Sequence, residues 1–173
     1  GQITYIDDVP VIGFYHLDEC LSSLAMSFYQ QGHGIKSKMQ VVGVTGTNGK
    51  STVTHLMASW VTLCGGKAAV MGTLGNGIVG EGPLLSTENT TGDAINIARQ
   101  LAEFAAQGVN LVAMEVSSHG LHQHRVAAVD FTQAVFTNLS RDHLDYHRDM
   151  QEYQDVKQML FLMPNISSRI INS

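Results

Sequence analysis

A glycine-rich segment that ends in a lysine and two hydroxyl residues lies in the first third of the 173-residue chain. It reads GTNGKST at 46–52, with an apolar strand pattern before it at 40–45 and an amphipathic helix pattern after it. This order predicts a phosphate-binding loop, because backbone N–H groups and the helix N-terminus would face the phosphate oxygens. Lys50 would reach the terminal phosphates of a nucleotide, and Ser51 would bind Mg²⁺. The match is to a short Gly-x-x-Gly-Lys-Ser variant, and the alternative is a glycine turn that only begins a helix.

An acidic residue interrupts a second apolar strand pattern, which reads LVAMEV at 111–116. A nucleotide site of this kind needs an acid that holds the metal ion at the end of a neighbouring strand, and Glu115 has that place. A carboxylate in an apolar strand is costly unless it is paired or bound to a metal. The alternative is that Glu115 lies at an exposed strand tip without a role.

A lysine falls within the apolar stripe of the helix predicted at 148–162. At helical spacing, Lys157 lies near the middle of a stripe formed by Met150, Tyr153, Leu160 and Phe161. Burial of an ammonium group lowers its pKa, so a neutral amine would become available there. The alternative is that Lys157 lies at the rim and extends its amine to water, with its stem covering apolar surface.

The elements that would position these residues alternate between strand and helix from residue 40 onward. This alternation predicts an α/β fold with a mostly parallel sheet flanked by helices. The first 39 residues differ, with an extended stretch at 9–14, a helix at 16–31 and a linker at 36–39. The further strands are expected at 67–71, 109–116, 130–136 and 169–172, and the further helices at 50–64 and 92–107.

Composition excludes several classes of protein. Apolar residues make up 44% of the chain and charged residues 14%, which favours a core-rich globular domain. The net charge of −5 argues against general attraction to nucleic acid or to anionic lipid. Cys20 and Cys64 form no CxxC pair, so we expect no disulfide framework and a reducing, cytoplasmic setting. No apolar run approaches the roughly 20 residues that span a bilayer, so membrane insertion is not expected.

Four motifs, in this order, closely resemble those of the Mur ligases. They read TGTNGK at 45–50, STENTTG at 86–92, MEVSSHGLHQHR at 114–125 and NLSRDHLDYH at 138–147. The resemblance implies the P-loop ATPase-like fold of the family's central domain for 40–173, which would be truncated. It also implies that 1–39 are the tail of the UDP-binding first domain plus a linker, and that the C-terminal domain, which binds the amino acid, is absent.

The resemblance also implies a reaction. ATP would phosphorylate the side-chain carboxylate of a D-glutamyl residue, and the amine of an amino acid would then attack the acyl phosphate. The motifs are most similar to those of the members that add a diamino acid to UDP-N-acetylmuramoyl-L-alanyl-D-glutamate, with meso-diaminopimelate favoured over L-lysine. Such an enzyme would serve peptidoglycan synthesis with ATP and Mg²⁺. This piece alone is expected to form no amide bond.

Roles follow from the resemblance residue by residue. The residues expected to hold the nucleotide are Gly46, Thr47, Asn48, Gly49, Lys50, Ser51, Thr52 and Asn138. Those expected to bind the UDP-muramoyl peptide are Asn89, Thr90, Thr91, Ser117, Gln123 and Arg125. One Mg²⁺ would be held by Ser51 and Glu115, and a second by Glu115 and His143. Lys157 would react with carbon dioxide to form a carbamate that helps to place the second ion, so the catalytic set is Lys50, Glu115, His143 and Lys157.

Other interpretations remain open at this point. The run DHLDYH at 142–147 could belong to a metal-dependent phosphohydrolase, although that leaves the glycine loop unexplained. A folylpolyglutamate-synthase-like ligase would share the loop and the acyl phosphate, and a nucleotide-binding fragment would have no activity of its own. The spacing of His119, His122 and His124 suits no standard zinc site, so we interpret them as loop histidines beside the substrate contacts.

Overall fold

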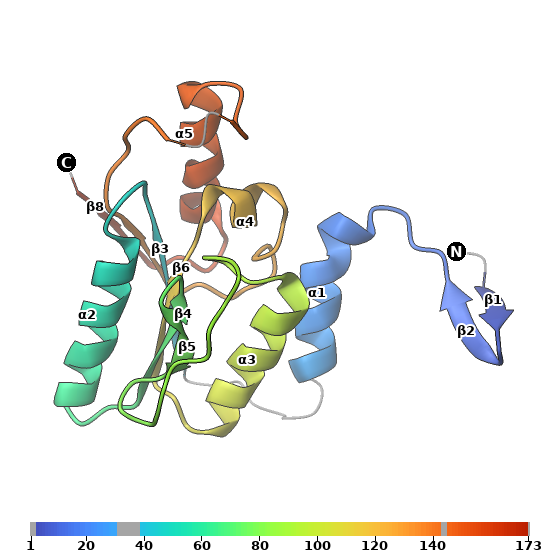
Figure 1. Ribbon diagram of the computed structural model, residues 1–173, viewed down its shortest axis with the longest axis horizontal. Coiled ribbons are helices and arrows are strands. Elements are labelled where there is room, and N and C mark those ends of the chain that lie inside the picture. The colour runs from blue at the N-terminus through green and yellow to red at the C-terminus, as the bar shows by residue number, and fades with distance from the viewer. Residues whose placement is uncertain (1–2, 31–38, 143–144, 173) are drawn as a thin grey trace.

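The computed structural model describes residues 3–30, 39–142 and 145–172, and its centre is a six-stranded sheet (Figure 1). The strand order is β5-β4-β6-β3-β7-β8. All neighbouring strands are parallel except β4 and β5, which are antiparallel. The strands are β3 (Gln40–Thr45), β4 (Ala68–Gly72), β5 (Gly75–Ile78), β6 (Leu111–Glu115), β7 (Gln133–Phe136) and β8 (Ser168–Ile171). The predicted α/β class with a mostly parallel sheet is confirmed.

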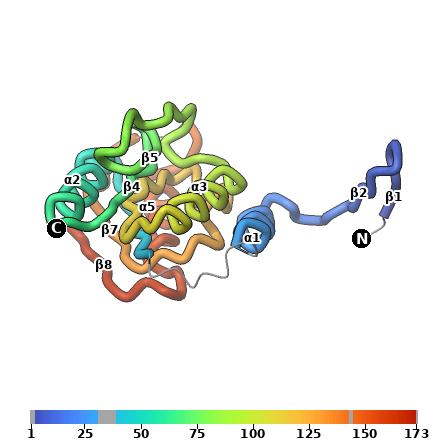
Figure 2. The backbone as a smooth tube through the Cα atoms, turned by 90° about the horizontal axis from the view of Figure 1, so that it is seen from below, coloured from blue at the N-terminus to red at the C-terminus, as the bar shows by residue number. Residues whose placement is uncertain are grey.

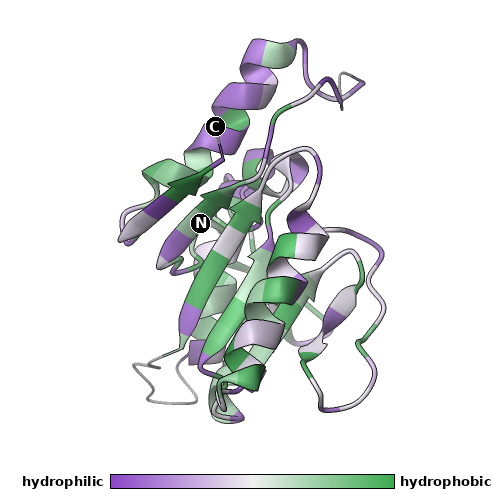
Figure 3. Cartoon of the chain, turned by 90° about the vertical axis from the view of Figure 1, so that its left-hand side faces the viewer, coloured by the Kyte–Doolittle hydropathy of each residue, from purple (hydrophilic) through white to green (hydrophobic). Residues whose placement is uncertain are grey.

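Helices cover both faces of this sheet. On one face α2 (Lys50–Leu63) packs against β3, β4 and β6. The other face carries α3 (Ala94–Ala106), α4 (Ser118–His122), α5 (Met150–Gln158) and the 3₁₀ helix η1 (Met159–Leu162). The helix α1 (Leu17–Gln30) packs outside α3, where the Ser22 hydroxyl accepts a hydrogen bond from the Ala128 N–H at 3.0 Å. The strands between these layers are largely apolar along their length (Figure 3).

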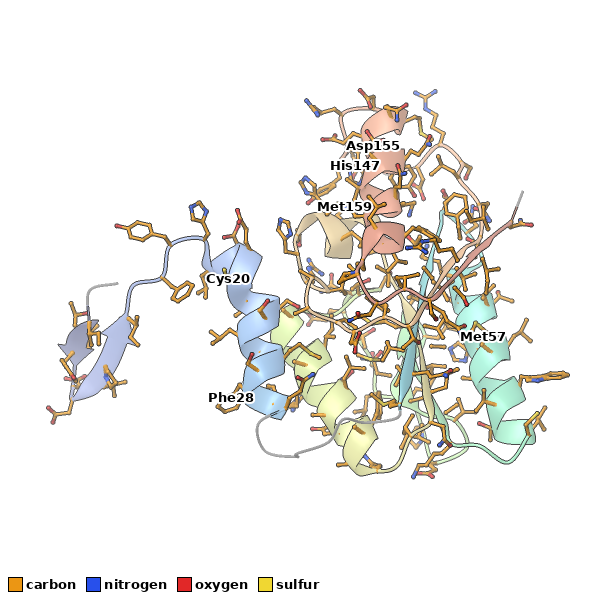
Figure 4. All side chains as sticks on the ribbon, turned by 180° about the vertical axis from the view of Figure 1, so that it is seen from behind. Cys20, Phe28, Met57, His147, Asp155 and Met159 are labelled. Atoms are coloured by element: carbon orange, nitrogen blue, oxygen red, sulfur yellow. The ribbon has the colours of Figure 1, made fainter. Side chains whose placement is uncertain are left out.

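A two-stranded hairpin stands apart from the sheet at the N-terminal end. Its strands β1 (Ile3–Ile6) and β2 (Val9–Ile12) are antiparallel, and all their residues are exposed. Figure 2 shows the hairpin separated from the sheet, with α1 between them. Figure 4 shows Cys20 and Phe28 on α1, and both side chains are exposed. The sequence predicted the extended stretch at 9–14 but not its partner strand.

Several boundaries differ from the predicted ones for physical reasons. The predicted helix at 148–162 is a nine-residue α-helix that tightens into η1. The sequence analysis missed β5, which reads GNGI, because two glycines weaken the strand pattern. It also missed α4, which is a single short turn of five residues. Within the described ranges, no helix has the length and apolar character needed to cross a membrane.

The carboxyl ends of the parallel strands meet at one edge of the sheet. The register pairs Val44 of β3 with Glu115 of β6, and Thr45 of β3 with Phe136 of β7. The segments that follow β3, β4, β6 and β7 therefore leave the sheet side by side. In open α/β sheets this edge is where ligands bind.

Candidate functional site at the carboxyl edge of the sheet

The predicted phosphate loop follows β3 directly and ends where α2 begins at Lys50. Gly46 and Gly49 have φ values of 142° and 83°, a region that side chains disfavour. A Cβ atom on Gly46 would lie 2.0 Å from the Thr137 hydroxyl oxygen, so no other residue fits there. The alternative of a simple glycine turn does not account for this close approach to the segment after β7.

The segment after β7 holds the loop by its backbone. The Asn138 amide accepts from the Asn48 N–H at 3.0 Å and donates to the Asn48 carbonyl at 3.0 Å. The Thr137 hydroxyl donates to the same carbonyl at 2.6 Å, and the Thr47 N–H donates to the Asn138 carbonyl at 2.9 Å. Asn138 therefore acts on the loop itself, and its expected contact with the nucleotide stays a prediction.

Lys50 folds back over the loop. Its ammonium group donates to the carbonyl oxygens of Gly46 at 3.0 Å and Thr47 at 2.8 Å. Burial lowers the pKa of Lys50, while the nearby negative charges of Glu115 and Asp142 oppose this shift. Ser51, in the first turn of α2, is half-buried. Because these two partners are neutral carbonyl oxygens, the Lys50 ammonium group can exchange them for the negatively charged oxygens of a phosphate.

Lys157 approaches the same loop from α5. Its side chain is 2% exposed, and its amine donates to the Gly46 carbonyl at 3.1 Å. Burial and the positive charge of Lys50 lower the pKa of Lys157 to about 7, although Asp142 acts in the opposite direction. The prediction of a buried lysine is confirmed, and the alternative of a lysine extended to water at the rim is wrong. The helical pattern did not reveal the partner of the Lys157 amine, the Gly46 carbonyl, which lies 111 residues away in the sequence.

Glu115 is 1% exposed at the end of β6, so the alternative of an exposed strand tip is wrong. Its carboxylate accepts from the Thr73 N–H at 3.0 Å and from the Thr73 hydroxyl at 3.2 Å. Gly72 makes room for it, because a Cβ atom there would lie 2.2 Å from the Glu115 Oε1 atom. The sequence analysis missed Thr73, and its position just after β4, beside β6, was the available signal.

The two motifs assigned to the substrate pack against each other beside Glu115. The Thr91 hydroxyl donates to the Glu115 carbonyl at 3.0 Å and accepts from the Ser117 N–H at 2.9 Å. Arg125 donates to the Thr91 carbonyl at 2.8 Å and, through Nε, to the Gln123 side chain at 2.9 Å. The segments 86–92 and 114–125 therefore form one surface.

The remaining members of this set lie on the same surface. The Thr90 hydroxyl lies 3.0 Å from that of Thr73, and Asn89 is exposed next to it. The Gln123 amide donates to the Tyr146 hydroxyl at 3.2 Å, and the His122 Nδ1 atom lies 2.9 Å from that hydroxyl. His122 thus lies beside Gln123, but the interpretation of His119 and His122 as loop histidines is wrong, because both belong to α4.

The described residues fit a magnesium ion in part. Thr73 gives the Glu115 side chain two hydrogen bonds from neutral groups, and Mg²⁺ prefers carboxylate oxygens as ligands. His143 lies outside the described residues, so its predicted metal contact is not assessed. Among residues 3–30, 39–142 and 145–172, no group of three or more His, Cys, Asp or Glu side chains is arranged to hold a metal ion. A site here would depend on Glu115, on the Ser51 hydroxyl and on oxygens of the ligand.

Comparison with known proteins agrees with this geometry. The model of the Mur ligase middle domain matches residues 44–173. UDP-N-acetylmuramoyl-L-alanyl-D-glutamate–2,6-diaminopimelate ligases from Vibrio parahaemolyticus and Haemophilus influenzae are 49% and 46% identical to the chain over 172 and 171 residues. These matches cover 99% of this chain and 34% of each relative, so the chain spans about a third of the length of these relatives.

Solved structures give the same picture. A ligase of the same name superposes with a TM-score of 0.81 and 37% identity, over 90% of this chain and 31% of that one. Escherichia coli FolC in complex with DHPP and ADP reaches a TM-score of 0.55 at 23% identity, over 79% of this chain and 37% of that one. The second likeness concerns the fold alone. Because the family model covers most of the chain, we conclude that this chain belongs to the Mur ligase family and carries its middle domain.

Proposed function

We propose that the chain is the ATP-binding part of a MurE-type ligase, which adds meso-diaminopimelate to UDP-N-acetylmuramoyl-L-alanyl-D-glutamate. The observation that carries this proposal is the convergence of Lys50 and Lys157 on Gly46, at the strand edge where Glu115 ends β6. The family match and the printed names of the relatives support the choice of reaction. In this proposal 1–39 belong to the end of a UDP-binding domain and 40–173 to the central domain, and the enzyme works in the cytoplasm.

The residues of this chain would act mainly by electrostatic positioning. Lys50 would leave the loop carbonyls and bind the oxygens of the transferring phosphoryl group, where negative charge accumulates. The backbone N–H groups of 46–52 would hold the other phosphate oxygens at the start of α2. Mg²⁺, held by Ser51 and Glu115, would neutralise part of that charge, and His143 is proposed to help hold a second ion. The surface formed by 86–92 and 114–125 would present the substrate carboxylate.

Lys157 is proposed to carry a carbamate. Its neutral amine would attack the carbon of carbon dioxide, forming an N–C bond, and the nitrogen would release one proton to water. The product keeps one N–H, which can still donate to the Gly46 carbonyl, so the observed hydrogen bond is compatible with both forms. The carbamate would place a negative charge beside Lys50, where burial and the positive charge of Lys50 already disfavour the protonated amine and lower the Lys157 pKa.

The test is a ligation assay on the full-length protein that carries this sequence. ATP, Mg²⁺ and the UDP-muramoyl dipeptide are supplied with meso-diaminopimelate or with L-lysine, and the amide product is measured by mass spectrometry. We expect product and phosphate release to require the diamino acid, with meso-diaminopimelate preferred. Lys50→Ala should lower the rate by about a hundredfold or more.

Other results would identify other functions. Phosphate release without an amino acid would indicate a phosphohydrolase. Turnover only with a folate and glutamate would indicate a folylpolyglutamate-synthase-like ligase. Wild-type turnover by Lys50→Ala would remove the phosphate-loop assignment. Amide formation by the isolated 173-residue chain would contradict the expectation that the other domains are required.

A further inference from the structure

Two buried side chains on α5, one helical turn apart, face consecutive residues of the phosphate loop. Lys157 donates to the carbonyl of Gly46, and the hydroxyl of Tyr153 lies 3.3 Å from the hydroxyl of Thr47. Tyr153 is 0% exposed and is among the largest fully buried side chains of the described residues. Burial raises the pKa of Tyr153, so its hydroxyl keeps its proton at neutral pH.

The hydroxyl of Thr47 can accept a hydrogen bond from the Tyr153 O–H. It accepts from the Ser140 N–H at 2.9 Å and donates to the Ser140 carbonyl at 3.2 Å. A hydroxyl group has one hydrogen and two lone pairs. With the Thr47 hydrogen on the Ser140 carbonyl, a lone pair of Thr47 is available to the Tyr153 O–H, and the two hydroxyl groups are within hydrogen-bond distance. The side chain of Thr47 is thus held between α5 and the segment that follows β7.

The ring of Tyr153 has a second contact. The Lys157 nitrogen lies over the ring, 4.5 Å from its centroid, so the amine packs on the face of the tyrosine. The ring of His147 packs against the same tyrosine, with centroids 5.2 Å apart, and Figure 4 shows His147 beside α5. The packed ring of Tyr153 therefore limits where the Lys157 amine can lie. The hydroxyl of Tyr153 holds the phosphate loop through Thr47.

We propose that Tyr153 is a positioning residue of the nucleotide site, which holds the phosphate loop ready through Thr47 and directs Lys157 to Gly46. This inference rests on the proposed function. Tyr153 acts through these two residues and is not itself assigned a contact with the nucleotide. A loop that is held in place before binding loses less conformational freedom when the phosphates arrive, so nucleotide affinity should depend on the tyrosine hydroxyl.

The first experiment removes only that hydroxyl. Tyr153→Phe in the full-length protein should raise the Kd for a non-hydrolysable ATP analogue with Mg²⁺ about three- to tenfold, as expected for one lost hydrogen bond. Titration calorimetry gives this Kd. The KM for the UDP-muramoyl dipeptide should stay unchanged. Tyr15→Phe is the matched control for nucleotide binding, because it deletes the same group from a side chain that is 89% exposed and far from the phosphate loop in the chain, and it should not change the Kd for the ATP analogue.

A double-mutant cycle tests whether the two hydroxyl groups act on each other. Thr47→Val removes the partner, and once it is gone Tyr153→Phe should have little further effect on the Kd. Tyr153→Leu also removes the ring, so the Lys157 amine should lose its place. The carbamate signal in ¹³C NMR, after incubation with ¹³C-labelled bicarbonate, should then fall in Tyr153→Leu but not in Tyr153→Phe.

Each outcome separates this inference from the proposed function. If the wild-type protein binds the analogue and Tyr153→Phe binds it equally well, the role of Tyr153 is overturned and the proposed function stands. Equal increases in both constants with a large fall in Tm would show a general packing role, which also overturns the inference. If the wild-type protein binds no analogue, the proposed function fails, and the inference fails with it.

Discussion

Lys50 and Lys157 donate to the same atom, the carbonyl oxygen of Gly46, at 3.0 and 3.1 Å. A carbonyl oxygen has two lone pairs, so it can accept both hydrogen bonds, but two ammonium groups at this separation from one atom repel each other. This repulsion adds to burial in lowering the pKa of Lys157. The arrangement favours a neutral or anionic Lys157, and it leaves Lys50 as the cation that responds to phosphate.

Small carboxylates should partly restore the ligase activity that is lost when the Lys157 side chain is removed. In the full-length protein, Lys157→Ala removes the proposed carbamate and opens space beside Gly46, where formate or acetate could supply a negative charge. We expect ligase activity to fall about a hundredfold or more and to recover partly on addition of the acid. Lys157→Met, which fills the space, is the control and should not be rescued. Full activity of Lys157→Ala without any acid would contradict the carbamate.

Stability should depend on pH through Lys157. Its pKa is about 7 in the folded chain and 10.5 as the ordinary value, so between these values the unfolded state binds a proton that the folded state lacks. Raising the pH from 7 towards 10 should therefore stabilise the fold, by up to ~1.4 kcal/mol per pH unit, with no further change below about pH 6.

Denaturant unfolding of the chain and of its Lys157→Met variant measures this effect. The free energy of unfolding of the wild type should rise relative to that of the variant between pH 7 and 9. Groups present in both proteins cancel in the difference. A difference that does not change over this range would show that the amine of Lys157 titrates as an ordinary lysine does.

Gly72 should be needed for the position of Glu115. In Gly72→Ala the new methyl group would lie 2.2 Å from the carboxylate, which must then move away from Thr73. Because Glu115 is proposed to hold Mg²⁺, the concentration of Mg²⁺ for half-maximal activity should rise about 10- to 100-fold. Gly13→Ala is the control, since nothing lies within 4 Å of a Cβ atom there. An unchanged Mg²⁺ requirement in Gly72→Ala would remove Glu115 from the metal site.

Arg125 should matter for the peptide substrate more than for ATP. Its guanidinium group lies on the Thr91 carbonyl and the Gln123 side chain, at the surface assigned to the muramoyl peptide. Arg125→Ala should raise the KM for the UDP-dipeptide about 10- to 100-fold, the usual cost of a charged hydrogen bond. Arg99→Ala, in an exposed pair with Glu103 on α3, is the control. An effect on the KM for ATP alone would assign Arg125 to the nucleotide.

The sequence by itself determined the features that depend on local spacing. The alternation of apolar runs with amphipathic segments predicted the parallel sheet, because a buried strand and a helix with one apolar face each leave a distinct periodicity. The phosphate loop was readable because glycines, a lysine and a helix start must be contiguous to surround a phosphate. The pattern marked Lys157 as unusual, but periodicity alone left open whether the lysine is buried or lies at the rim, and the structure shows that it is buried.

Only the tertiary structure decided which distant residues meet. Thr73 on Glu115, Tyr153 on Thr47 and Asn138 on Asn48 join positions 42, 106 and 90 residues apart. Sequence periodicity does not predict such pairs, because they depend on the strand order and on the turns that follow each strand. Tyr153 looked like an ordinary core residue in the helical stripe, and its hydroxyl became informative only when α5 was placed against the loop. The contact between Tyr153 and Thr47 is buried, where a polar group without a partner is costly.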